Sequence, residues 1–247
     1  MIISGLQKVT LLDYPGHIAC TIFFGKCNLR CPFCHNMELV EHPEHFPTFS
    51  INDILDFLKE RKGKLNGVAI TGGEPLLNKD IADLLKPIKE LGYPIKLDTN
   101  GFFPDMIEKL IDEKLVDMFA MDIKAGWKSY LKVAGANADS AGTMHYRRGE
   151  FHEPAWQSKI KKSISLLINK SIDYEFRTTC VKGLHTDEDF YEIKEMIKNA
   201  KNYYLQNYKA APDMKDLPFK PFTREELEHF ANIVKDSVGN VALRGVD

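Results

Sequence analysis

Residues 18–36 read IACTIFFGKCNLRCPFCHN, an apolar stretch followed directly by a loop with three of the chain's five cysteines. The apolar part, residues 18–24, is typical of a buried strand. Cys27, Cys31 and Cys34 follow it at the spacing C-x3-C-x2-C. Three thiolates at this spacing can hold three irons of a 4Fe–4S cluster and leave the fourth iron without a protein ligand. An iron with an open position is a place where chemistry can occur.

The same loop allows a second interpretation. His35 follows the last of the three cysteines and could complete a Cys3His zinc site. The other two cysteines, Cys20 and Cys180, lie in apolar runs and are predicted to be packing residues. A disulfide framework is disfavoured, because five is an odd number and the chain opens without the pattern of a secretory signal.

The composition indicates an ordinary globular protein. The 247 residues carry a formal net charge of −2, and 44% of them are hydrophobic. This balance predicts neither a nucleic-acid surface nor attraction to an anionic membrane, and no apolar run approaches the roughly 20 residues that span a bilayer. We therefore expect one cytoplasmic domain over residues 1–247, with a short N-terminal arm at 1–16 and an atypical loop at 126–154.

Strand and helix patterns alternate about six times after the cysteine loop. The predicted strands cover residues 17–24, 67–71, 94–98, 116–123, 172–180 and 203–208, and a last short strand covers 241–244. Such alternation predicts an α/β fold with a parallel sheet and right-handed crossovers. A closed barrel of eight units needs about 250 residues, and the arm and the atypical loop use part of this length. We predict an open, partial (β/α)6 barrel of the TIM type, with a doubly wound open sheet as the alternative.

Unusual polar clusters end or directly follow the predicted strands. They are the three cysteines, Gly72-Gly73-Glu74, Asp98-Thr99-Asn100, Asp122 with Lys124, Arg177, and Gln206-Asn207. The carboxyl ends of parallel strands meet at one face of a sheet or barrel, and that face carries the site. We therefore expect these clusters to converge.

The residue types in these clusters suggest what they bind. Gly72-Gly73 would let the backbone approach a ligand closely, and Glu74 could accept a hydrogen bond from an ammonium or a ribose hydroxyl. Asp98 and Asp122 need a cation between them, supplied by a metal ion or by Lys124. The absence of G-x-G-x-x-G excludes the dinucleotide-binding fingerprint.

Arg177 and Lys124 together suit a ligand carboxylate, with a barrel-lining ion pair as the alternative. The whole set fits a ligand with an amino-carboxylate, a ribose and a site on iron, and S-adenosylmethionine meets this description. Its amine and carboxylate can chelate the open iron. One electron from the reduced cluster would then cleave a C–S bond and give methionine and a 5′-deoxyadenosyl radical.

With these motifs the chain resembles the radical S-adenosylmethionine superfamily, through the cysteine motif and Gly72-Gly73-Glu74-Pro75. It is more closely similar to glycyl-radical-enzyme activating enzymes, and among these to the type that activates anaerobic ribonucleoside-triphosphate reductase. The closer similarity rests on Asp13–Gly16, Asp98–Gly101, Met121–Lys124 and Tyr174–Thr179.

The resemblance implies roles for individual residues. Cys27, Cys31 and Cys34 would hold one 4Fe–4S cluster, since the chain lacks a further cysteine-rich insertion. The residues expected to contact S-adenosylmethionine are Phe33 and His35 on the adenine side, Gly72, Gly73 and Glu74 beside the amine, and Asp122, Lys124 and Arg177. A monovalent cation would be held by Asp98, Thr99, Asp122 and the carbonyl of Ala120.

The resemblance also implies an oxidoreductase with a protein substrate. It would abstract a glycine hydrogen from a partner glycyl radical enzyme, here an anaerobic ribonucleotide reductase, using electrons from a flavodoxin- or ferredoxin-type donor. The segment 135–154, with Tyr146-Arg147-Arg148, looks longer than usual for the type and is a candidate partner contact or a surface loop. Two rivals stay open, namely a 7-carboxy-7-deazaguanine synthase-like enzyme and a zinc-stabilised binding module without catalysis.

Overall fold

A single sheet of eight strands, in the order β1 to β8, forms the centre of the computed structural model, which describes residues 1–135, 153–210 and 218–246. β1 pairs antiparallel with β2, and all later neighbours are parallel. The strands are β1 Ile3–Thr10, β2 Ala19–Phe24, β3 Gly67–Gly72, β4 Ile95–Thr99, β5 Met118–Asp122, β6 Asp173–Cys180, β7 Asn202–Asn207 and β8 Asn240–Arg244.

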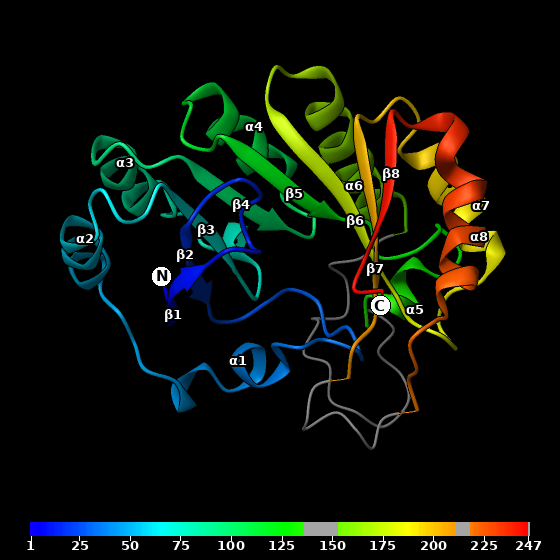
Figure 1. The fold of residues 1–247 in the computed structure, drawn as a ribbon, viewed down its shortest axis with the longest axis horizontal. Helices are drawn as coiled ribbons and strands as arrows, with labels where there is room; N and C mark the ends of the chain where they lie inside the picture. Colours follow the sequence, from blue (N-terminus) through cyan, green and yellow to red (C-terminus); the bar gives the residue numbers. More distant parts are fainter. Residues whose placement is uncertain (136–152, 211–217, 247) are drawn as a thin grey trace.

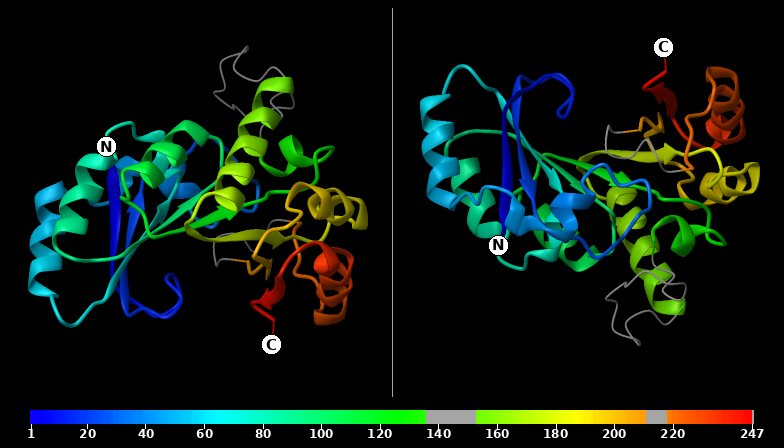
Figure 2. Two further views of the ribbon diagram at one scale, coloured as in Figure 1. Left: turned by 90° about the horizontal axis from the view of Figure 1, so that it is seen from above. Right: turned by 90° about the horizontal axis from the view of Figure 1, so that it is seen from below.

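Helices connect the parallel strands along the outside of the sheet (Figure 1). They are α1 Met37–Glu41, α2 Ile51–Glu60, α3 Ala82–Glu90, α4 Pro104–Asp112, α5 Tyr130–Val133, α6 Glu153–Asn169, α7 Asp187–Met196 and α8 Arg224–Val234. The edge strands β1 and β8 lie well apart in every view (Figure 2), so the barrel is open. The predicted open, partial (β/α)6 barrel is confirmed, and the arm at 1–16 supplies its antiparallel edge strand.

Local sequence explains most helix boundaries. α2 begins after Ser50, whose hydroxyl accepts from the Asp53 N–H at 3.1 Å, while the Asp53 carboxylate accepts from the Ser50 N–H at 2.7 Å. α3 begins at Ala82 and not directly after Asn78, although asparagine is a common helix cap. The Asn78 side chain instead donates to the Pro75 carbonyl at 3.1 Å and closes the short 3-10 turn Pro75–Leu77.

The strands separate an apolar face from a charged face because successive side chains alternate. In β4, Ile95 and Leu97 are fully buried in the main core together with residues of the helices. Lys96 and Asp98 alternate with them and point to the other face, where they form an ion pair. Cys20 and Cys180 are also fully buried, in agreement with their predicted packing role.

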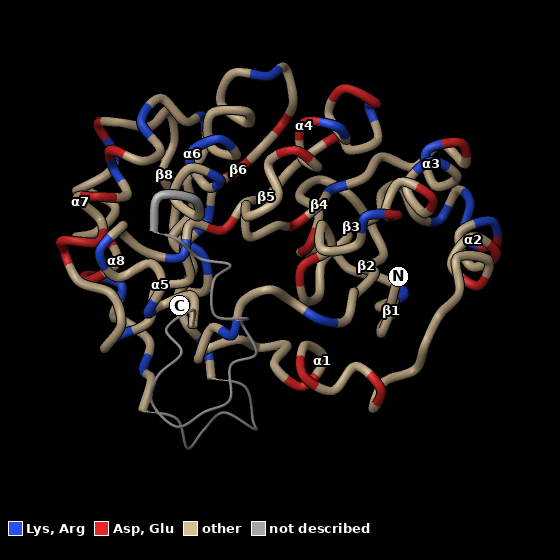
Figure 3. Tube along the Cα trace, turned by 180° about the vertical axis from the view of Figure 1, so that it is seen from behind, with Lys and Arg blue, Asp and Glu red and all other residues tan. Residues whose placement is uncertain are grey.

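The outer surface carries charges of both signs. Lys and Arg side chains are interspersed with Asp and Glu over α2, α3, α4, α7 and α8 (Figure 3). Within the described residues, no helix has the length and apolar character needed to cross a membrane. Tyr146-Arg147-Arg148 lies outside the described residues.

Candidate functional site

One pocket collects side chains from the cysteine loop and from the carboxyl ends of β3 to β6. All but one of the residues that the sequence nominated for cofactor or metal binding line it: Cys27, Cys31, Phe33, Cys34, His35, Gly72, Gly73, Glu74, Asp98, Thr99, Asp122, Lys124 and Arg177. Ala120, whose carbonyl was nominated for the cation, is absent from this lining. The last predicted cluster, at the end of β7, is absent from this lining. Asn207 there exchanges hydrogen bonds with the backbone of Phe222 at 2.9 and 3.0 Å, whereas Gln206 lines a neighbouring cavity together with Asp98 and Arg177.

The three loop cysteines have the chemistry of a cluster site. All three are free thiols, and burial raises the pKa of Cys27 to about 12 and that of Cys31 to about 11. Thiols with such a pKa stay protonated at neutral pH, and positive charge from bound metal is what makes the thiolate stable. The converging, sulfur-only donor set fits the iron–sulfur cluster expected from the spacing.

His35 is anchored at the mouth of the pocket. Its Nε2 lies 2.5 Å from the carbonyl oxygen of Lys209, just after β7, and its ring is nearly parallel to that of Tyr208 at 5.9 Å. A metal-bound histidine commonly donates its second ring N–H to a backbone carbonyl, so this contact is compatible with both predicted roles of His35. His35 as a neighbour of a bound cofactor stays a prediction.

The glycine turn after β3 packs against the backbone that leads into the cysteine loop. A Cβ atom at Gly73 would lie 1.8 Å from the carbonyl oxygen of Lys26, and one at Gly72 would lie 2.4 Å from that of Phe24. The Gly73 N–H donates to the Phe24 carbonyl at 2.7 Å, and the Glu74 N–H donates to the Lys26 carbonyl at 2.9 Å. Both glycines line the pocket as predicted, and close packing against Phe24–Lys26 is a further reason for them.

Glu74 is a buried carboxylate with three protein donors. Oε1 accepts from the Leu76 N–H at 3.1 Å and the Thr99 hydroxyl at 2.9 Å, and Oε2 accepts from the Asn100 N–H at 2.7 Å. Burial raises the pKa of Glu74 to about 7, although these hydrogen bonds and Lys124 act to lower it. An ionised carboxylate offers about four acceptor positions, so Oε2 has room for one more donor.

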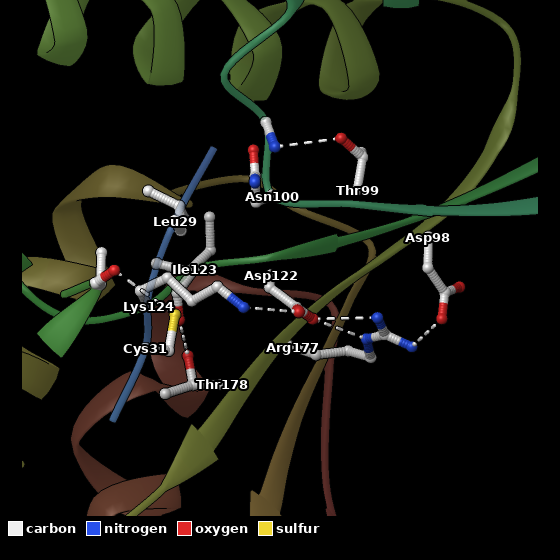
Figure 4. A network of polar contacts seen from close by, with 12 residues as sticks. Leu29, Cys31, Asp98, Thr99, Asn100, Asp122, Ile123, Lys124, Arg177 and Thr178 are labelled. Carbon is white, nitrogen blue, oxygen red and sulfur yellow. Dashed lines mark hydrogen bonds and ion pairs between the residues drawn. The ribbon is translucent and has the colours of Figure 1, made fainter. Parts of the chain in front are cut away.

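Arg177 joins the two aspartates at the ends of β4 and β5 (Figure 4). Its guanidinium lies 3.2 Å from Asp98 and 2.9 Å from Asp122, and Lys124 lies 2.8 Å from the second carboxylate. Burial opposes ionisation of Asp122, but Arg177 and Lys124 outweigh it and hold the pKa at about 2. Burial would lower the pKa of Lys124, but Asp122 and Cys31 raise it above its ordinary value. The network therefore stays charged at neutral pH.

These contacts bear on the predicted monovalent cation. Arg177 already supplies a cation between Asp98 and Asp122, as the ion-pair alternative expected. The third side chain of the proposed set, Thr99, donates its hydroxyl to Glu74. The monovalent cation stays a prediction.

Two further residues contact the cysteine loop without having been nominated. The Asn100 side chain donates to Asn28 of the loop at 2.7 Å. A Cβ atom at Gly135 would lie 1.8 Å from the carbonyl oxygen of Arg30, and the Arg30 N–H donates to the Ala134 carbonyl at 3.2 Å. Asn100 belongs to a strand-end cluster, which was a usable signal, whereas Gly135 after α5 looks like an ordinary helix-ending glycine.

A separate group of exposed side chains follows α1. Ligand atoms of His42, Glu44 and His45 lie within 4.8 Å of one another. Each histidine already pairs with a carboxylate, His42 with Glu44 at 3.2 Å and His45 with Glu38 at 2.7 Å. These pairings on the exposed surface account for the group.

Comparison with known proteins agrees with the cysteine loop and the partial barrel. The radical SAM superfamily model matches residues 21–197. A candidate glycyl-radical enzyme activating enzyme of Methanocaldococcus jannaschii is 32% identical over 251 residues, covering 100% of this chain and 97% of that protein.

Shorter matches cover about half of the chain. The pyruvate formate-lyase-activating enzyme of Clostridium pasteurianum is 32% identical over 126 residues, 49% of this chain and 52% of that protein. A GTP 3′,8-cyclase of Saccharolobus solfataricus is 36% identical over 118 residues, 45% of this chain and 36% of that protein.

Solved structures share the fold. Streptococcus suis SuiB bound to S-adenosylmethionine has a TM-score of 0.61 at 19% identity, covering 91% of this chain and 52% of that one. The chain belongs to the radical SAM superfamily, a family of enzymes that use a 4Fe–4S cluster and S-adenosylmethionine, and one relative that it matches over its full length is a candidate glycyl-radical-enzyme activating enzyme.

Proposed function

We propose that this chain activates a glycyl radical enzyme by removing a hydrogen atom from the Cα of a glycine in that partner. When bound, the reduced cluster and S-adenosylmethionine supply the 5′-deoxyadenosyl radical that this step needs. The observation that carries the proposal is the full-length similarity to a candidate activating enzyme. The convergence of the activase-like strand-end motifs on one pocket with the three cysteines supports it.

Within this proposal the chain's own residues bind and orient the cofactors. Cys27, Cys31 and Cys34 hold one cluster. Glu74 Oε2, which has room for one more donor, suits the ammonium of S-adenosylmethionine, and Lys124 suits its carboxylate. Phe33 is buried in the loop, and together with His35 it forms the wall proposed for the adenine ring.

A second cavity, next to the cofactor pocket, is the surface that we propose for the partner segment. It shares Asp98 and Arg177 with the cofactor pocket, and it continues toward the β1–β2 connection and β8. Leu11 and Leu12 line it with exposed fractions of 68% and 88%, and exposed apolar side chains in such a place suit contact with another protein.

Mixing the reconstituted protein with candidate partners tests the proposal. After anaerobic reconstitution the chain should hold about four irons. With S-adenosylmethionine, a flavodoxin- or ferredoxin-type donor and an anaerobic ribonucleotide reductase, electron paramagnetic resonance should show a glycyl radical on the partner.

Other outcomes separate the alternatives. Cleavage of S-adenosylmethionine without a glycyl radical on any partner of a panel would overturn the activase proposal and favour a small-molecule substrate. A radical on a different glycyl radical enzyme would overturn only the choice of ribonucleotide reductase. A chain that retains zinc and takes up no iron would contradict the cofactor assignment itself.

A further inference from the structure

Asn100 contacts both Glu74, in the turn after β3, and Cys27, the first cysteine of the loop. Its backbone N–H donates to Glu74 Oε2 at 2.7 Å. Its side-chain Nδ2 donates to Asn28 Oδ1 at 2.7 Å and lies 3.7 Å from the sulfur of Cys27, within reach of an N–H···S hydrogen bond. Only 5% of Asn100 is exposed, so water cannot easily replace these contacts.

The orientation of the Asn100 amide follows from its neighbours. Oδ1 accepts from the Phe102 N–H at 3.1 Å. A flipped amide would lose this bond and would place oxygen against both Asn28 Oδ1 and the Cys27 sulfur. The NH2 group carries two hydrogens, so it can serve the Asn28 oxygen and the sulfur together. The N–H therefore faces Cys27.

A hydrogen-bond donor beside a cluster sulfur changes the relative stability of the oxidised and reduced cluster. Reduction adds negative charge to the cluster and its cysteine sulfurs, and hydrogen bonds to these sulfurs stabilise that charge. Cys27 also accepts from the Leu29 N–H at 3.3 Å, so Asn100 is the side-chain member of a pair of donors. A side chain can be changed without altering the backbone that holds the loop.

We propose that Asn100 is a positioning residue for the iron–sulfur cluster, which orients Cys27 and raises the reduction potential of the cluster through its side-chain N–H. The inference rests on Cys27 as a cluster ligand. It is independent of the partner protein and of which substrate the radical attacks. It also gives the third strand-end cluster a task beyond the cation prediction.

The test compares Asn100→Ala and Asn100→Asp with the control Asn78→Ala. Asn100→Asp keeps a side-chain acceptor for the Phe102 N–H and removes the donor. Asn78 is a matched control because its side-chain amide also donates a hydrogen bond, to the Pro75 carbonyl at 3.1 Å, in the turn that follows Glu74. The readout is the midpoint potential of the reconstituted cluster, from a redox titration followed by electron paramagnetic resonance.

Both Asn100 variants should show a midpoint potential more negative than wild type, and Asn78→Ala should match wild type. Equal potentials in all four proteins would overturn the proposal. If both Asn100 variants fail to retain iron, thermal melts of the metal-free chains distinguish an effect on the cysteine loop from a general loss of fold stability. An unchanged melt would confirm an effect on the cysteine loop, and a lowered melt would assign Asn100 a general structural role instead.

Discussion

Asp122 and Arg177 are register partners on the adjacent parallel strands β5 and β6, and their side chains form an ion pair of 2.9 Å. The arginine side chain is only 12% exposed, and its other terminal nitrogen reaches Asp98 at 3.2 Å. One cation therefore holds together the ends of three strands beside the cofactor pocket.

Removing this cation should destabilise the fold. Arg177→Ala leaves Asp98 and Asp122 buried with less compensation, and breaking a buried pair in this way costs about 3–5 kcal/mol. Urea unfolding measures the loss. Lys162→Ala is the control, because its partner Asp105 is 90% exposed and a surface pair contributes about 0–1 kcal/mol. Similar losses in the two variants would contradict a special role for Arg177.

The raised pKa of Glu74 should make the free energy of unfolding depend on pH. Burial raises its pKa from 4.5 to about 7, so the folded chain binds this proton more tightly than the unfolded chain. The resulting stabilisation is complete below pH 4.5 and is lost as the pH rises through about 7. It amounts to about 3 kcal/mol, from 1.36 kcal/mol per unit of pKa.

Comparison with Glu74→Gln isolates this contribution, because the amide does not titrate in this range. Between pH 5 and pH 8, the unfolding free energy of wild type should fall relative to that of Glu74→Gln. A difference that is constant over this range would mean that Glu74 ionises with its ordinary pKa.

Gly135 should be required for cluster retention. Gly135→Ala places a Cβ atom against the carbonyl oxygen of Arg30, and the cysteine loop must move to relieve the overlap. Gly183→Ala is the matched control, since Gly183 also has a positive φ (+97 against +68) and has no atom within 4 Å of the added Cβ. Iron content per chain after reconstitution should fall in the first variant and stay at the wild-type level in the second.

Lys124→Ala should weaken binding of S-adenosylmethionine and leave the cluster in place. A hydrogen bond to a charged group contributes about 1.5–3 kcal/mol, which corresponds to roughly 10- to 100-fold in affinity. Isothermal titration of the reconstituted protein measures it, with Lys128→Ala as the control because that side chain is 85% exposed. Unchanged affinity in Lys124→Ala would remove this residue from the proposed site.

Much of the site could be predicted because it depends on local order along the chain. The spacing of Cys27, Cys31 and Cys34 is set within eight residues. Strand–helix alternation places the carboxyl ends of parallel strands at one face, so Glu74, Asp98 and Asp122 were expected to converge without any knowledge of distances. In the cluster at the end of β7, Asn207 bonds to Phe222 instead, and Gln206 lines the neighbouring cavity with Asp98 and Arg177.

The sequence by itself predicted the open barrel, the cysteine loop and most of the charged residues that line the pocket, because strand period and motif spacing are properties of neighbouring residues. Only the tertiary structure decided which of them touch. Arg177 reaches Asp98 across 79 residues of sequence, and Asn100 reaches Asn28 across 72. Contacts at this range depend on strand register and on packed crossovers, so only the folded chain shows that Asn100 lies against Cys27 and Gly135 against Arg30.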